Sequence, residues 1–572
     1  MRYSSLTPLI HIASSILSVF GTEITMSNRR ELVKFKFDAL PPGAVSPTGW
    51  LKDQLQLSAD GLAGYLFEFY RYVSRSTWLG GDWEYSELNE ASSYWFNYIV
   101  PSAWSLDDAK LKSQAKAYLD YVLNHQAEDG WLGPETTRQT RGLWARSLLL
   151  FGLTQYAEAD PSARDLIVDS MHKFLKLTHS ILRSNFTGLT QDENQGDHFD
   201  PFGFRLSRTH ELPIYFMWLY ENHPRDAGDI ILETIELMFD GGRKGGRDWT
   251  EFFFEGVFPK GGTGTFETSS FTHGVNLAQG LRYLTVLYRL TGNDSLVQQT
   301  KMAVDMTAKY QGSELCMAVE SIFSYAFLYR FHGVNSYADK AELAAFNPFP
   351  AAMSPGWWSH HPAAQSTTLK RTQIRIPGWT TPEANIEMNG GRSKRVTPDD
   401  SGLHHATILP GSTTLTLKLP MEVRIEMRNS SASISYGPLL YTFDIPYTET
   451  HHQPLNWTDR KPLADEEVHP RSHDYVLEPT EPWQYAIDPD SIVVKTSTLS
   501  IENLPNPIFS RDAPPVFLTV DAWKIAWPTD EDTAAWPPID PVVDKDKKEK
   551  IKLVPFGSAK LHIAQFPVSK PQ

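Results

Sequence analysis

Few residues in this chain have the types and spacing that chemistry needs. Glu314 and Cys316 stand two positions apart, and Glu342 lies on the next predicted helix. Carboxylates and thiolates are ligands that zinc accepts, and paired carboxylates can divide the roles of acid and base. The alternative is structural. A lone cysteine at a helix start is often a small buried hydrophobe, and a glutamate in a first turn suits the helix dipole.

Two histidines and a tryptophan are candidates for binding. His210 precedes Glu211 in the string THELP, and His273 opens HGVN. A neutral imidazole offers one donor and one acceptor, which suits a diol. Trp95 carries a flat ring that can stack on a ring-shaped ligand. Each of the three also has a structural alternative, as a hydrogen-bonded or packed core residue.

The segment that must position these residues is helical. Apolar residues recur at three- and four-residue spacing over 143–159, 212–222, 275–292 and 315–333. Polar turns with proline or glycine follow each stretch, so we expect antiparallel helix hairpins. Such a chain closes into a toroid or stacks as a solenoid. No fixed-length repeat is present, which disfavours a consensus solenoid.

Past residue 368 the apolar period changes to two. The stretches 368–379, 413–428, 431–443, 516–525 and 551–563 are typical of strands bounded by proline and glycine. We therefore predict a multidomain α + β protein, with a helical domain followed by β-sandwich-like domains. The expected divisions are a leader over 1–37, the helical domain over 38–350, a short junction over 351–370, and β-domains over 371–450 and 451–572.

The charge composition of the chain argues against two classes of binding partner, nucleic acids and anionic membranes. The net charge of the 572-residue chain is −15, and its one strongly charged run, 544–550, has mixed signs. A nucleic-acid binder would show a basic stripe, and an acidic surface repels anionic membranes. We therefore expect neither nucleic acid nor a membrane as partner.

The N-terminus and four sequons indicate secretion. Residues 6–21 are moderately apolar and follow Arg2, which predicts a signal peptide; the alternative is an upstream start, with Met26 beginning the chain. The N-x-S/T sequons predict an extracellular glycoprotein, and they begin at Asn185, Asn293, Asn429 and Asn456.

Several strings in a fixed order resemble glycoside hydrolase family 127, the β-L-arabinofuranosidase type. They run from LPPGAVSPTGWLKDQL (40–55) through FGFRLSRTHELPIYFMWLYEN (202–222) and HGVNLAQGLRY (273–283) to VPFGSAKLHI (554–563). The Glu314-Leu315-Cys316 triplet is similar to the family's central E-x-C signature. The resemblance covers nearly the whole chain and implies an (α/α)6 barrel with β-sandwich domains.

The resemblance also implies a site. In the family, a cysteine thiolate on zinc is the nucleophile, with three cysteines and a glutamate as ligands. Glu314 and Cys316 match two of these ligands, and His210, His273 and Glu342 resemble residues of the sugar pocket. The cysteine pair and the acidic segment before E-x-C have no counterpart here, because Cys316 is the chain's one cysteine. Two ligands do not make a closed zinc site, so we predict no tightly bound zinc.

The resulting prediction is a glycoside hydrolase-like protein that resembles β-L-arabinofuranosidases, either acting on an arabinofuranoside or a related sugar or inactive because the zinc–cysteine motif is incomplete. If the chain keeps activity, a carboxylate pair such as Glu314 with Glu342 or Glu211 could in principle replace the zinc–cysteine route. Two alternatives stay open: a non-catalytic carbohydrate-binding protein, and a truncated gene model. Sequencing of the transcript, and of the genomic DNA around codons 311 and 362, tests the second alternative.

Overall fold

The computed structural model describes residues 31–254, 257–258, 273–310, 315–354, 357, 368–369, 373–406, 412–456, 458–464, 468–497, 503–530 and 533–569. Most of the predicted leader, most of the predicted junction, and Glu314 lie outside these residues.

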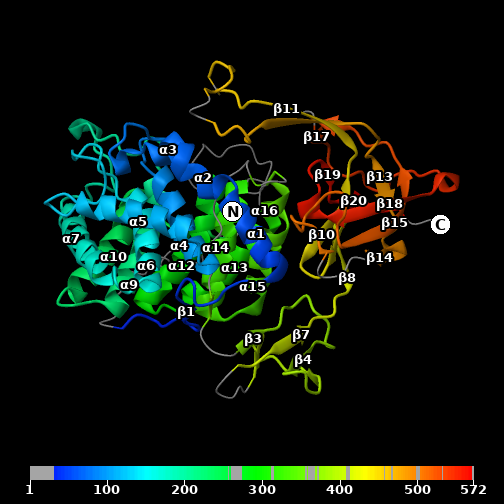
Figure 1. Ribbon diagram of the computed structural model, residues 1–572, viewed down its shortest axis with the longest axis horizontal. Coiled ribbons are helices and arrows are strands. Elements are labelled where there is room, and N and C mark those ends of the chain that lie inside the picture. The colour runs from blue at the N-terminus through cyan, green and yellow to red at the C-terminus, as the bar shows by residue number, and fades with distance from the viewer. Residues whose placement is uncertain are drawn as a thin grey trace, which may run out of the picture.

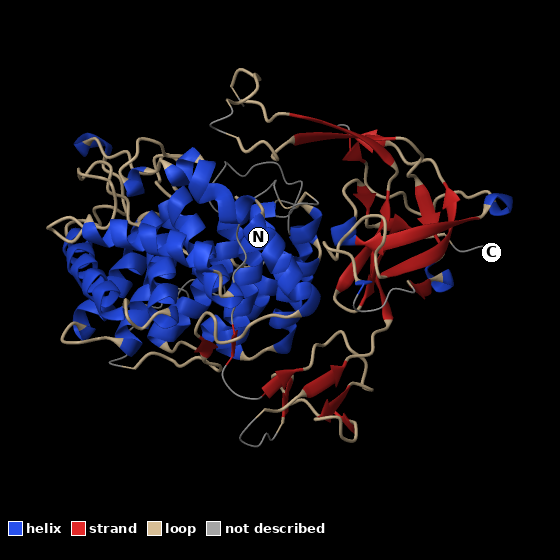
Figure 2. Ribbon diagram, in the orientation of Figure 1, coloured by secondary structure: helices blue, strands red, loops and turns tan. Residues whose placement is uncertain are grey.

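The first part of the described chain is helical, as Figures 1 and 2 show. The long helices are α1 (Gly49–Asp60), α2 (Leu62–Phe69), α4 (Ala91–Leu106), α5 (Ala109–Asn124), α6 (Trp144–Ala159), α7 (Arg164–Arg183), α9 (Glu211–Asn222), α10 (Gly228–Lys244), α12 (Gly274–Thr291), α13 (Ser295–Tyr310), α14 (Leu315–His332) and α15 (Asn335–Phe346). The single-turn helices are α3 (Arg71–Ser74), α8 (Phe204–Ser207), α11 (Trp249–Phe252) and α16 (Pro348–Ala351). The four helical stretches predicted from periodicity correspond to α6, α9, α12 and α14.

The long helices alternate between an inner and an outer ring. Helix α4 packs on α6, α6 on α9, and α12 on α14, whereas α5, α7, α10, α13 and α15 pack against these from outside. Burial explains the division. Helices α6 and α12 are buried on nearly every side, but α7 and α10 carry one buried stripe with a three- and four-residue period. An all-apolar helix belongs inside, and an amphipathic one at the surface.

An N-terminal strap, residues 31–42, crosses the barrel at the C-terminal ends of α12 and α14. The Val33 amide donates to the Arg289 carbonyl at 2.9 Å, and the Phe37 amide donates to the Arg330 carbonyl at 3.1 Å. The strap ends in β1 (Ala39–Leu40), which pairs antiparallel with β2 (Thr368–Leu369). It appears in dark blue along the lower edge of the helices in Figure 1.

The second part is built of antiparallel strands. The largest sheet has nine strands in the order β13-β15-β18-β10-β9-β20, with β14, β19 and β8 paired to β15, β10 and β9. These strands are β8 (Val423–Arg428), β9 (Ser431–Tyr436), β10 (Leu439–Asp444), β13 (Tyr485–Ile487), β14 (Val493–Thr496), β15 (Val516–Lys524), β18 (Glu549–Pro555), β19 (His562–Ile563) and β20 (Phe566–Pro567). The sheet lies beside the helices on the right of Figure 1.

Smaller β-units precede and flank this sheet. They comprise the strands β3 (Gln373–Arg375), β4 (Asn385–Met388), β5 (Lys394–Arg395), β6 (Leu403–His405), β7 (Leu415–Lys418), β11 (Tyr447–His452), β12 (Asp474–Pro479), β16 (Thr529–Asp530) and β17 (Thr533–Ala534). Strand β3 pairs with β6, and β4 lies between β5 and β7. Strand β11 forms a hairpin with β12, as β16 does with β17.

The multidomain α + β fold is confirmed. The domain boundaries stay a prediction, although the nine-stranded sheet takes strands from both sides of the proposed boundary at residue 450. Three of the four sequon asparagines, Asn185, Asn293 and Asn429, are exposed, and secretion also stays a prediction. Among the described residues, no helix has the length and apolar character that crossing a membrane requires.

Candidate functional site

The inner helices bring polar side chains together at their N-terminal ends. Five elements contribute to this layer: α4, the α8–α9 turn, α9, α12 and α14. We call it the polar layer, and its members are Tyr94, Arg208, His210, Glu211, Asn276, Gln279, Arg282, Glu320 and Ser324. Most of these side chains are buried. A buried polar group is costly unless it is hydrogen-bonded, so the pairings within the layer decide what it can do.

Glu211 and Arg282 form the centre of the polar layer. The Arg282 Nη2 atom lies 2.5 Å from Glu211 Oε1, and its Nε atom lies 3.2 Å from the same oxygen. Burial alone would raise the pKa of Glu211, but the positive charge of Arg282 and the hydrogen bond with His210 hold it at about 2. Glu211 is therefore an ionised carboxylate at neutral pH.

His210 supports this carboxylate from the side. Its Nε2 atom lies 2.9 Å from both Glu211 Oε1 and the Gln279 carbonyl oxygen. Both partners are acceptors, so Nε2 carries the proton. Burial lowers the pKa of His210, against the opposing effect of Glu211, which favours the neutral ring. The imidazole is fully buried, and its Nε2 atom contacts Glu211 and the Gln279 carbonyl group.

Glu320 is the second carboxyl group on the same arginine. Its Oε2 atom lies 3.4 Å from Arg282 Nη2, and Ser324 Oγ accepts a hydrogen bond from Arg282 Nη1 at 2.8 Å. Burial raises the pKa of Glu320; Arg282 opposes the rise, and the negative charge of Glu211 adds to it. The environment thus pushes the two carboxyl groups toward opposite protonation states, the pattern that separates an acid from a base.

The layer continues toward α8 through Arg208. Its Nε atom donates to Asn276 Oδ1 at 2.6 Å, and its guanidinium lies 4.3 Å above the Trp144 ring. The Phe204 ring also faces this guanidinium, at 4.5 Å, and stacks on His273 with ring centroids 5.0 Å apart. His273 therefore lies at the edge of the polar layer, where it directly precedes α12.

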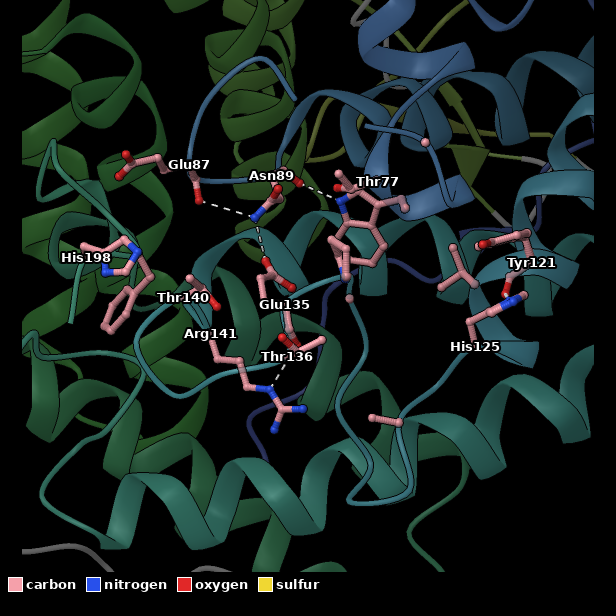
Figure 3. A pocket seen from close by; sticks show the side chains of 17 residues that line it. Thr77, Glu87, Asn89, Tyr121, His125, Glu135, Thr136, Thr140, Arg141 and His198 are labelled. Carbon is pink, nitrogen blue, oxygen red and sulfur yellow. Dashed lines mark hydrogen bonds between the residues drawn. The ribbon is translucent and has the colours of Figure 1, made fainter. Parts of the chain in front are cut away.

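A rim pocket of about 750 Å³ opens beside this face of the barrel (Figure 3). It is lined by loops that precede α4, α6 and α8 and by the end of α5. Its walls mix aromatic rings, such as Trp78 and Tyr121, with polar groups that include Glu87, Asn89 and His198. Its size falls within the range of ~300–1,000 Å³ for small-molecule sites.

The wall of the rim pocket rests on a buried ion pair. Arg146 Nη1 lies 2.9 Å from both oxygens of Glu135, and Asn89 Nδ2 and Trp131 Nε1 donate to the same carboxylate at 2.8 and 3.0 Å. The Arg146 guanidinium lies between the rings of Trp78 and Trp131, 4.8 Å from each. Figure 3 shows Asn89 reaching toward Glu135 across the pocket wall.

A small cavity adjoins the rim pocket on the side of Trp144. It shares Glu135 and Phe199 with the rim pocket and reaches Trp144 and Asp200. Trp144 is the ring that Arg208 covers. The polar layer and the rim pocket thus lie on the same face of the barrel, with Trp144 and Arg208 between them.

Some of the site residues predicted from the sequence lie at the polar layer, and others lie elsewhere in the fold. Glu211, His210 and His273 lie in or beside the polar layer, and the half-buried Cys316 lies in the first turn of α14. Trp95 lies in the core at 1% exposure, stacked on Phe67 with centroids 5.1 Å apart. Trp95 is therefore a packed core residue, because neither face of its ring is open to a ligand.

Glu342 lies outside the polar layer. Its Oε1 atom pairs with Arg375 Nη1 at 2.5 Å, and its Oε2 atom accepts a hydrogen bond from Trp379 Nε1 at 2.8 Å. Arg375 also pairs with Asp339 and donates to Asn335 Oδ1 at 2.9 Å. Glu342 thus joins α15 to the end of β3 and to Trp379, which follows β3.

The residues present do not fit the zinc–cysteine centre of the family. Cys316 is the one cysteine of the chain, and Glu314 lies outside the described residues. Within the described ranges, no three His, Cys, Asp or Glu side chains gather as a metal site would need. A tetrahedral thiolate centre requires several sulfur ligands, and this chain has one cysteine.

Sequence reasoning missed Arg282 and Glu320. Both stand on buried inner helices among apolar neighbours, and Lys, Arg and Glu are almost never fully buried unless paired. A charged residue in the middle of an otherwise apolar helix is the signal that could have found them. Its partner could not be found, because Glu211 and Arg282 lie 71 positions apart.

The sequence matches no protein-family model and no curated protein. The structure is similar to a GH127 β-L-arabinofuranosidase from Geobacillus stearothermophilus T6, with a TM-score of 0.56 and 12% identity over 94% of this chain and 100% of that one. It is also similar to a glycoside hydrolase, with a TM-score of 0.59 and 10% identity over 94% of this chain and 98% of that one. A GH127 β-arabinofuranosidase is similar too, with a TM-score of 0.57 and 12% identity over 95% of this chain and 99% of that one. At this identity the likeness establishes the fold, which agrees with the fold that the resemblance implies.

Proposed function

We propose that this chain is a glycoside hydrolase-like protein that takes an arabinofuranoside or a related sugar at the N-terminal ends of its inner helices. The observation that carries the proposal is the pair Glu211 and Glu320 on one arginine, at the face where the rim pocket opens. The fold it shares with arabinofuranosidases supports the class of sugar.

The paired carboxyl groups supply the chemistry of the proposal. Both contact Arg282 Nη2, at 2.5 and 3.4 Å, so these two oxygens lie no farther apart than the sum of those distances. That bound admits the ~5–5.5 Å spacing of retaining glycosidases. In this scheme Glu320 is the proton donor, because burial raises its pKa, and the ionised Glu211 faces the anomeric carbon.

Hydrolysis of aryl α- and β-L-arabinofuranosides, followed by release of the aryl alcohol, tests the scheme. We expect turnover that survives dialysis against a chelator and falls ~10²–10⁴-fold in Glu320→Gln. Exposed Glu128→Gln is the matched control. Loss of turnover in Glu314→Gln and Glu342→Gln, with Glu320→Gln active, would instead favour the carboxylate pair predicted from the sequence.

One observation favours a second candidate function, a carbohydrate-binding protein without turnover. Glu211 is buried and engaged by both Arg282 and His210, which leaves it little freedom to meet a sugar. Calorimetry with the same arabinosides separates the two candidates. Heat of binding with no aryl alcohol released supports the binding protein, and turnover supports the hydrolase.

A further inference from the structure

A second cavity, of about 850 Å³, lies at the opposite end of the barrel. The last turns of α6, α9, α12 and α14 line it, and the N-terminal strap forms one wall. The strap is held firmly there, because the Phe35 ring lies between the guanidinium groups of Arg289 and Arg330, at 4.1 and 4.0 Å. Its volume lies in the range of small-molecule sites.

A layer of aromatic rings separates this strap cavity from the polar layer. Phe151 stacks on Tyr215 and on Phe323, with ring centroids 5.3 and 5.1 Å apart. All three rings line the strap cavity. Arg282 lies 4.3 Å above the Phe323 ring. Burial raises the pKa of Tyr215; the charge of Glu211 adds to the rise, and that of Arg282 opposes it. This aromatic layer therefore lies between the strap cavity and the polar layer.

The strap cavity offers a ring platform beside hydrogen-bonding groups. The half-buried Trp218 ring lines it, oriented by a 2.7 Å hydrogen bond from its Nε1 atom to Glu158 Oε1. One turn before Glu158, the Gln155 side chain also lines the cavity. Its buried Nε2 atom has no hydrogen-bond partner among the described residues. A buried donor without a partner is costly, and a ligand oxygen would remove that cost once the Gln155 amide turns toward the cavity.

The charges around the strap cavity nearly balance. Four cationic side chains (Lys34, Arg164, Arg289 and Arg330) stand against three carboxylates (Asp38, Glu158 and Glu221). The C-terminal ends of the four helices carry partial negative charge, which adds to the negative charge of the three carboxylates. Arg289 already pairs with Glu221. Neither a cation nor an anion gains much here, so a neutral ligand fits best.

We propose that the strap cavity is a second binding site, specific for a neutral saccharide that stacks on Trp218 and accepts a hydrogen bond from Gln155. A tryptophan face with amide and carboxylate groups beside it matches the apolar face and the hydroxyl edge of a sugar ring. This site does not depend on the proposed activity of the polar layer.

Binding to the purified full chain tests the proposal. L-Arabinose, D-galactose and lactose are titrated by calorimetry, with D-galacturonate and D-galactosamine as charged counterparts of galactose. We expect a neutral sugar to bind, and the charged counterparts to bind at least ~10-fold more weakly, about 1.4 kcal/mol. Hydrogen exchange should slow at the strap amides of Val33, Lys36 and Phe37 when the sugar binds. Failure of all three neutral sugars to bind, or equal binding of a charged counterpart, overturns the proposal.

Variants locate the bound sugar. Gln155→Leu and Trp218→Leu should each weaken binding ~10-fold or more, whereas Trp218→Phe should keep most of it. Gln155→Leu should fold normally, because the amide nitrogen it removes has no partner among the described residues. Trp536→Leu, at an exposed ring in the β-rich part, is the matched control. Binding that is lost in Glu320→Gln but kept in Trp218→Leu would place the sugar at the polar layer, which overturns this inference and supports the proposed function.

Discussion

Arg282 and Glu211 form an ion pair inside the barrel, with Nη2 and Oε1 2.5 Å apart and both side chains almost fully shielded from water. Their helices, α12 and α9, belong to the inner ring, so the pair links two neighbouring walls. The pair also sets the charge at the centre of the polar layer, where Glu320 contacts the same guanidinium.

The first prediction concerns Arg282→Met. Methionine keeps much of the volume but leaves Glu211 buried without its cation, and breaking a buried pair by removing one partner costs ~3–5 kcal/mol. We expect a loss of that size in the free energy of unfolding, measured by urea denaturation. Arg183→Met, at an exposed arginine, should change it little. An unchanged midpoint for Arg282→Met would show that Glu211 takes up a proton at little cost.

The second prediction is the pH dependence of the same pair. The pKa of Glu211 is about 2 in the folded chain, below its ordinary value of ~4.3. Its contribution to stability is therefore complete above the ordinary value and is lost as pH falls toward 2. The stability difference between the native chain and Glu211→Gln should shrink from about pH 5 to about pH 3. A difference that stays constant over this window would contradict the lowered pKa, and Glu128→Gln serves as the control.

The helices and strands follow from local patterns. Stretches such as 315–333 have a helical period and end at a glycine, and the structure forms α14 there. The period of two over 431–443 likewise becomes β9 and β10. These features depend on neighbours within one element, which a sequence displays directly.

The candidate site could be predicted only in part. His210, Glu211 and His273 stand out because they open helices at the end of the barrel that gathers polar groups. Glu342 was expected among them, but Arg375 and Trp379 hold it at the junction with the β-rich part. Such pairings join positions far apart in the chain, so neither periodicity nor spacing reveals them.

The third prediction concerns the ion pair beneath the rim pocket. Glu135 and Arg146 are both buried, and Arg146 is enclosed by Trp78 and Trp131. Glu135→Gln and Arg146→Met should each destabilise the fold by ~3–5 kcal/mol. The double variant should cost less than the two single variants together, because it leaves no unpaired charge. Additive losses in a double-mutant cycle would mean that the two side chains stabilise the fold independently.

The fourth prediction concerns close packing between α11 and α12. A Cβ atom added to Gly280 would lie 2.6 Å from three atoms of the Trp249 ring, which is itself fully buried and donates from Nε1 to the Ser207 carbonyl at 2.7 Å. The ring cannot move away without losing this bond, so Gly280→Ala should cost ~1–3 kcal/mol of unfolding free energy despite the helical preference for alanine. Gly228→Ala, at the start of α10, meets only Tyr220 at 3.4 Å and should be neutral or stabilising. Thermal unfolding of both variants decides the matter, and equal melting temperatures would show that Trp249 has room to shift.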